Sequence, residues 1–115
     1  VTCVPMHKDT LRKRGYNQAE LLAKECARIL GIEYADLLAK TKKNKTQHSI
    51  KAAERAKNVI GVYSPIDKNL IKGKRILIID DIITTGSTLG ECARILNKCK
   101  CGEICCCTLC TSLLI

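Results

Sequence analysis

Two adjacent acidic residues stand just before a run of hydroxyl residues in the C-terminal third of the chain. Asp80 and Asp81 follow the apolar run 76–79, and residues 84–88 read Thr-Thr-Gly-Ser-Thr. The amides and hydroxyls of such a run can bind a phosphate, and its glycine lets the backbone approach closely. Carboxylates repel phosphate but accept hydrogen bonds from sugar hydroxyls. The pattern therefore predicts a phosphorylated-sugar site, with sugar hydroxyls on Asp80 and Asp81 and phosphate on Thr84, Thr85, Gly86, Ser87 and Thr88.

The residues on either side predict the elements that hold this site. A strand is expected at 75–80, and its unbroken apolar run at 76–79, ended by acids, indicates that it is buried on both faces of a parallel sheet. Thr88 and Glu91 have the spacing of a capping box, so a helix is expected from about Thr88. Ligands bind at the carboxyl ends of such strands, and a helix N-terminus adds positive potential. The alternative is a helix cap beside two solvated acids, but adjacent charges ending an isoleucine-rich strand are costly without a ligand.

The rest of the chain is predicted to alternate strands and helices. A helix starts at Asn17, with Glu20 completing a capping box, and ends at Gly31. Residues 6–16 are expected to form a basic loop and residues 40–57 a long polar loop, and long loops in compact domains are often lids. Further strands are expected at 1–5, 37–39, 58–63 and 104–109, with turns at 64–65 and 71–74. This order predicts an α/β fold, a Rossmann-like, mainly parallel sheet flanked by helices, in one domain.

Charge and composition limit the class of protein. The formal net charge is +9, and 17 of the 20 Lys and Arg residues lie in residues 1–75. This half is expected to meet phosphates or nucleic acid, although a solvated basic surface is the alternative. Apolar residues make up 46% of the chain, yet no run is long enough to cross a membrane and no secretory signal opens it, so a cytoplasmic protein is expected. The first residue is Val1, so the chain is expected to be processed or a fragment.

The nine cysteines are an odd number, which argues against a disulfide scaffold. Six of them crowd into residues 99–110, where Cys107 and Cys110 are spaced as in C-x-x-C, but no second pair stands at zinc-finger spacing. Because a structural zinc needs four convergent ligands, no protein-bound metal is expected. The cysteines are instead predicted to fill small buried positions of a strand in a reducing cytosol.

Residues 76–88 closely resemble the phosphoribosyl pyrophosphate motif of the type I phosphoribosyltransferases. Other segments look like the signature of the ComF/GntX family: Val4-Pro5-Met6-His7, residues 12–19, Lys45-Thr46 with Ser49, and Glu54-Arg55 with Asn58-Val59. The resemblance covers essentially the whole chain and implies a phosphoribosyltransferase-like domain over residues 1–115. The N-terminal zinc ribbon and first helix usual in that family are absent, so an N-terminal truncation is expected.

The resemblance also implies residue roles. Asp80 and Asp81 would hold the ribose 2′- and 3′-hydroxyls, and residues 84–88 the 5-phosphate. Arg12 and Arg14, in the loop after the first strand, would lie near the pyrophosphate. Lys45, Gln47 and Arg55 would belong to a mobile loop that closes over the substrate, with Lys45 and Arg55 catalytic. Mg²⁺ would arrive with the pyrophosphate, near Asp80 and Asp81. For the basic residues, the alternative is an exposed turn or a solvated charge run.

Two functions follow from this resemblance. The first is a Mg²⁺-dependent transferase that moves phosphoribosyl from phosphoribosyl pyrophosphate to an unknown nitrogenous acceptor, in nucleotide metabolism. The second is a non-catalytic ComF-type competence protein for DNA uptake, which binds a phosphoribosyl ligand, single-stranded DNA, or DNA-uptake and helicase proteins. No membrane partner is expected, and a homo-oligomer is left open.

Overall fold

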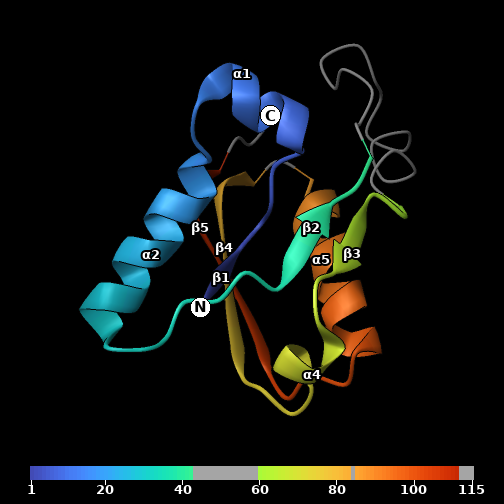
Figure 1. Cartoon of the computed structure of the whole chain (residues 1–115). Helices are drawn as coiled ribbons and strands as arrows, with labels where there is room; N and C mark the ends of the chain where they lie inside the picture. Colours follow the sequence, from blue (N-terminus) through green and yellow to red (C-terminus); the bar gives the residue numbers. More distant parts are fainter. Residues whose placement is uncertain (43–59, 84, 112–115) are drawn as a thin grey trace.

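The computed structural model describes residues 1–42, 60–83 and 85–111 (Figure 1). In chain order its elements are β1 (Thr2–Cys3), α1 (Lys8–Arg14), α2 (Gln18–Leu30), β2 (Leu38–Lys40), β3 (Tyr63–Pro65), α4 (Lys68–Ile71), β4 (Ile76–Ile83), α5 (Ser87–Lys98) and β5 (Ile104–Thr111). None of the helices in these ranges is long and apolar enough to cross a membrane.

A parallel three-stranded sheet lies at the centre of the fold, in the order β1-β4-β5. Thr2 pairs with Ile78 on one side of β4, and Cys106 pairs with Ile78 on the other. The strands β2 and β3 form a separate antiparallel pair in which Lys40 lies opposite Tyr63. The predicted α/β fold with a mainly parallel sheet is confirmed.

The two faces of the sheet are covered differently. Figure 1 shows α2 on one face and α5, with the β2–β3 pair, on the other. The α2 side is a small core in which Ala19 and Ala23 pack against Cys3 and Ile79. The α5 side is a larger core that joins both sheets, built from Val4, Leu37, Leu38, Val62, Tyr63, Ile71, Ile76, Ile78, Leu89, Cys92, Ile95 and Leu96.

The segment after β1 is a helix, so the prediction of a basic loop over residues 6–16 was wrong. The Nδ1 atom of His7 accepts a hydrogen bond from the amide of Asp9, which caps α1, and Gly15 ends the helix with a φ of 85°. Basic residues fill the last turn of α1, where they complement the negative end of the helix dipole. A short helix without a buried residue has no apolar stripe, so periodicity could not reveal it.

The central strand is longer than its apolar run. β4 continues through Asp80 and Asp81 to Ile83, because β5 pairs with it as far as Thr111. The acids therefore lie inside the strand instead of ending it.

The predicted capping box at α5 was also wrong: α5 begins at Ser87, Gly86 is its N-cap, and Glu91 pairs with Arg94. At α2, Asn17 caps as predicted, but Glu20 accepts from Lys24 instead of completing a capping box.

The strand predicted at 58–63 is displaced. Residues 58–59 lie outside the described residues, Ile60 and Gly61 form a turn, and β3 runs over Tyr63–Pro65. The predicted turn at 64–65 was thus wrong, since Ser64 pairs with Ala39 and Pro65 with Leu38. Proline is tolerated there because β3 pairs only with β2 and needs no amide donor on its outer side.

The strand β5 lies at the edge of the sheet and is exposed along most of its length. The side chains of Cys105, Cys106, Cys107 and Cys110 are all exposed, and Leu109 is 72% exposed. The prediction that these cysteines fill buried positions was therefore wrong. Cys3, in β1, is buried in the smaller core as predicted for a strand cysteine, whereas Cys92 is buried in the larger core on the helix α5.

Candidate functional site

A cavity of about 380 Å³ opens at the carboxyl ends of β1 and β4. Its base is formed by the segment after β1 together with the two acids of β4. Further lining residues come from α1 and the start of α2, and from the β2–β3 pair and the start of α5. The lining residues are Val4, Pro5, Met6, His7, Thr10, Arg14, Asn17, Gln18, Lys40, Tyr63, Asp80, Asp81 and Thr88.

The acidic pair is held by its own backbone. Asp80 accepts a hydrogen bond from the amide of Asp81 at 2.9 Å, and Asp81 accepts from the amide of Ile82 at 2.9 Å. Burial, followed by the neighbouring carboxyl of Asp81, raises the pKa of Asp80 to about 7. A carboxyl with a pKa near neutrality readily releases its proton to solvent when a ligand that favours the ionised form binds, such as a sugar hydroxyl donor or a cation.

The turn that leads into α5 combines hydroxyls with an uncapped helix start. The Thr85 and Ser87 hydroxyls lie 2.8 Å apart, and the amide of Ser87 donates to the Thr85 hydroxyl at 3.3 Å. Gly86 is the N-cap, with a φ of 81°, and provides no side-chain acceptor for the first turn. Thr88, in that first turn, lines the cavity. The N-cap residue of α5 therefore offers no side-chain acceptor, and among the described first-turn amides the Thr85 hydroxyl accepts only from that of Ser87. This arrangement leaves room for an anion at the helix start.

The two arginines predicted near the pyrophosphate differ in position. Arg14, the last residue of α1, lines the cavity. Arg12 is not among the lining residues, and its side chain is 76% exposed and lies 4.0 Å from Asp9. Successive residues of a helix point in different directions, so α1 directs only one of the two toward the cavity.

Several cavity residues were missed by sequence reasoning. Lys40 and Tyr63 come from the β2–β3 pair, and their side chains interact, with Nζ 5.8 Å from the ring centroid. In the sequence, Lys40 opens the polar segment 40–57, where nothing distinguishes it from the other lysines. His7 and Asn17 also line the cavity. The only local signal for Asn17 was its own position as the N-cap of α2.

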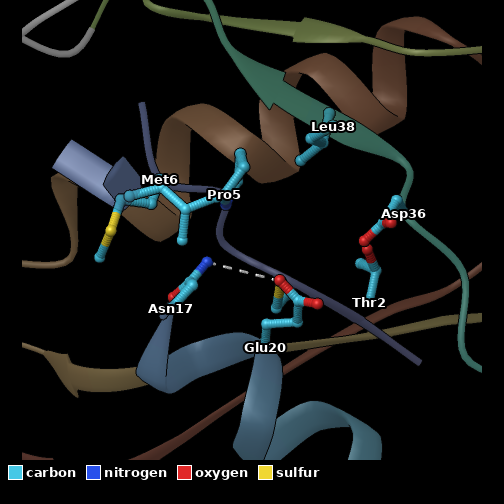
Figure 2. A pocket seen from close by; sticks show the side chains of 9 residues that line it. Thr2, Pro5, Met6, Asn17, Glu20, Asp36 and Leu38 are labelled. Atoms are coloured by element: carbon cyan, nitrogen blue, oxygen red, sulfur yellow. Dashed lines mark hydrogen bonds between the residues drawn. The ribbon is translucent and has the colours of Figure 1, made fainter. Parts of the chain in front are cut away.

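Asn17 links this cavity to a smaller one beneath it. Its Oδ1 caps α2, and its Nδ2 donates to the carbonyl of Val4 at 3.1 Å and approaches the Cys3 sulfur at 4.0 Å. Figure 2 shows this smaller pocket, of about 90 Å³, with the Asn17 amide and the Glu20 carboxyl on one side and Thr2 and Asp36 on the other. Asn17 therefore fixes the segment after β1 that forms the base of the larger cavity.

Of the predicted site residues, the structure brings Asp80, Asp81, Thr88 and Arg14 to one cavity. Thr85, Gly86 and Ser87 precede Thr88 in the turn without lining the cavity. Thr84, Lys45, Gln47 and Arg55 lie outside the described residues.

The donor set can also be tested against a magnesium ion. No group of three or more metal-binding side chains occurs within residues 1–42, 60–83 and 85–111. Asp80 and Asp81 nevertheless offer hard carboxylate oxygens beside an anion site. Magnesium is commonly bound by one or two carboxylates together with substrate phosphates, so these residues fit an ion that arrives with its ligand.

Comparison with known proteins assigns the class. The family model described as the phosphoribosyl transferase domain matches residues 17–113. A solved structure of "the allosteric regulatory enzyme of purine biosynthesis" shares the fold, with a TM-score of 0.53 and 24% identity over 73% of this chain and 18% of that chain. The chain belongs to the phosphoribosyl transferase domain family.

Its relatives identify the branch of that family. Competence protein F of Haemophilus influenzae is 36% identical over 88% of this chain and 45% of its own length. Competence protein ComFC of Streptococcus pneumoniae is 33% identical over 83% of this chain, and DNA utilization protein YhgH of Escherichia coli is 29% identical over 85%. The chain is thus a member of the ComF group, and it spans less than half the length of these relatives.

Proposed function

We propose that this domain binds phosphoribosyl pyrophosphate with Mg²⁺ in the cavity at the carboxyl end of β4, and transfers phosphoribosyl to a nitrogenous acceptor with release of pyrophosphate. The observation that carries the proposal is the meeting of Asp80 and Asp81 with Arg14 and the start of α5 in one cavity. The pair suits the ribose diol, and the turn 84–88 suits the 5-phosphate. The acceptor is left unassigned.

The chain's own groups would act on the ligand in distinct ways. Asp80 and Asp81 would orient the ribose by accepting hydrogen bonds from its hydroxyls, which holds C1 in place for attack. As the bond from C1 to the pyrophosphate oxygen breaks and a bond to the acceptor nitrogen forms, negative charge grows on the leaving group. Cations near the leaving group stabilise the transition state more than the ground state. Arg14, which lines the cavity, is proposed to be one of these cations. Lys45, Gln47 and Arg55 are proposed to approach from the segment that lies outside the described residues. Bound Mg²⁺ would neutralise the same charge.

Calorimetric titration with phosphoribosyl pyrophosphate and Mg²⁺ tests the binding step. We expect binding by the wild-type protein and its loss in the double variant Asp80→Asn/Asp81→Asn. The matched control is Glu103→Gln, which removes an exposed acid just before β5, at the opposite end of the sheet. Equal binding by all three proteins would contradict the site. Pyrophosphate release with a panel of bases and amines then tests transfer.

A second function is favoured by the relatives' names, which refer to competence and DNA utilization. In this alternative the domain holds a phosphoribosyl ligand without turnover, and the basic residues gathered in 1–75 bind single-stranded DNA or a protein of DNA uptake. Binding of a labelled oligonucleotide should then fall steeply with salt. No binding at about 50 mM salt, where phosphate contacts are strong, would exclude the nucleic-acid part.

A further inference from the structure

We propose that Lys40, which lines this cavity together with Arg14, binds a phosphate group of the ligand there. This inference rests on the proposed function and adds to it a residue that neither the motif nor the family resemblance assigns.

The backbone holds Lys40 in a fixed place. Lys40 is the last residue of β2 and lies opposite Tyr63 in the register with β3. Just after it, the amide and hydroxyl of Thr41 both donate to the carbonyl of Val62, at 2.8 and 3.1 Å. Just before it, Leu38 is buried in the larger core. Lys40 is therefore presented to the cavity by a strand anchored on both sides of it.

Its side chain is held by an aromatic ring and not by an acid. The Nζ atom lies 5.8 Å from the centroid of the Tyr63 ring, and Tyr63 is only 5% exposed. Among the described residues, the ion pairs involve other cations, and Lys40 forms none. The ring contact orients the ammonium group but cannot neutralise its charge.

A half-buried cation without an ion pair is incompletely compensated. Burial lowers the pKa of Lys40, while the charge of Asp80 acts in the opposite direction. A phosphate entering the cavity would supply the missing anion, and Lys40 would then hold it with a charge-assisted hydrogen bond.

The position of Lys40 also complements the other cation of the cavity. Arg14 comes from α1 and Lys40 from the β2–β3 pair, and both line the cavity that also holds Asp80 and Asp81. Two cations supplied by different elements can hold a ligand that carries phosphates at two ends, while its sugar hydroxyls meet the acids.

The test compares Lys40→Met with a matched variant, Lys74→Met, which removes an exposed lysine just before β4, at the opposite end of the sheet. Affinities are measured by calorimetry for phosphoribosyl pyrophosphate, ribose 5-phosphate and inorganic pyrophosphate, each with Mg²⁺. We expect Lys40→Met to weaken phosphoribosyl pyrophosphate binding at least ten-fold and Lys74→Met to leave it within two-fold. Loss of ribose 5-phosphate binding would assign Lys40 to the 5-phosphate, and loss of pyrophosphate binding would assign it to the diphosphate.

A further measurement separates ligand binding from a merely structural role. If Lys40 served only to balance Asp80, its removal would raise the apparent pKa of Asp80, read from the pH dependence of stability, with ligand affinity unchanged. That result would overturn the proposal. If the wild-type protein binds none of the three ligands, both the proposed function and the role of Lys40 are contradicted. If the wild-type protein binds and Lys40→Met binds equally well, only the role of Lys40 is contradicted.

Discussion

The same hexapeptide, Glu-Cys-Ala-Arg-Ile-Leu, occurs at 25–30 in α2 and at 91–96 in α5, but it is buried differently in the two helices. In α2, Ile29 is 68% and Leu30 58% exposed, whereas in α5 Ile95 is 6% exposed and Leu96 fully buried. The repeated hexapeptide by itself predicts similar sheet contacts for the two helices, and this prediction is wrong.

The difference comes from the neighbours of each helix. α2 packs on the sheet with the alanines Ala19, Ala23 and Ala27, which recur every four residues and let the helix approach closely. α5 lies between β4 and the β2–β3 pair, so a wider part of its surface is covered. Identical local sequence thus has the same helical conformation in both places, while burial is decided by the elements around it.

The largest expected effect is at the last residue of the repeat. Leu96→Ala removes a fully buried side chain and should destabilise the protein by about 2–5 kcal/mol. Leu30→Ala should change the free energy of unfolding by no more than about 0.5 kcal/mol, because its side chain is mostly in water. Urea unfolding of both variants measures the two changes in the free energy of unfolding. Equal losses of stability would contradict the exposure of Leu30 in this fold.

The first residue of the repeat sharpens the contrast. Glu91 is 6% exposed, pairs with Arg94, and its Oε1 lies 3.4 Å from the amide of Gly61. Replacing it by glutamine weakens charge-assisted hydrogen bonds in a buried place, and should cost roughly 1–3 kcal/mol. Glu25 makes the same pairing with Arg28 on the surface, so Glu25→Gln should have no measurable effect. Urea unfolding of both variants measures this contrast. A loss of stability in Glu25→Gln without one in Glu91→Gln would contradict the greater role given to the buried pair.

The starts of the two helices should also respond differently. Asn17 caps α2 and is 8% exposed, so Asn17→Ala should destabilise the protein by about 1–2 kcal/mol. Ser87 follows an N-cap glycine and provides no cap, so Ser87→Ala should change stability by less than about 0.5 kcal/mol. Thermal melts of both variants, with and without phosphoribosyl pyrophosphate, are the measurement. A stability loss at Ser87 without ligand would mean that the start of α5 is not open to an anion.

Two carboxyl groups should give opposite pH dependences. The Arg94 hydrogen bonds lower the pKa of Glu91, so its stabilisation is present above its unfolded pKa and is lost as pH falls below it. Burial raises the pKa of Asp80 to about 7, from an unfolded value of about 3.9. The folded state then binds the proton more tightly, and stability declines as pH rises from about 4 to about 7. Asp80→Asn should remove this decline, measured by urea unfolding across pH. A decline that persists in the variant would contradict the raised pKa.

Prediction from sequence worked best where local signals and tertiary contacts agree. The cap at Asn17, the end of α2 at Gly31, and the run 76–79 are local features, and each appears in the fold. The acidic pair and Thr88 were correctly expected to come together, because a parallel strand followed by a helix fixes that geometry. What failed depends on contacts between distant segments. The extension of β4 to Ile83 requires β5, and the exposure of the β5 cysteines requires that strand to lie at an edge.

The cavity was only half predictable for the same reason. Asp80, Asp81 and Thr88 lie within one motif, whereas Lys40 and Tyr63 reach the cavity because β2 and β3 pair with each other and pack on α5. No spacing in the sequence records that packing.

The exposed thiols of β5 have a practical consequence for handling the protein. Cys105, Cys106, Cys107 and Cys110 are open to solvent on an edge strand, while Cys3 and Cys92 are buried. In air, disulfides between molecules should form through the outer four first, since exchange requires an accessible thiolate. Purified protein stored without reductant would then migrate as covalent dimers on a non-reducing gel, and would return to a single band with dithiothreitol.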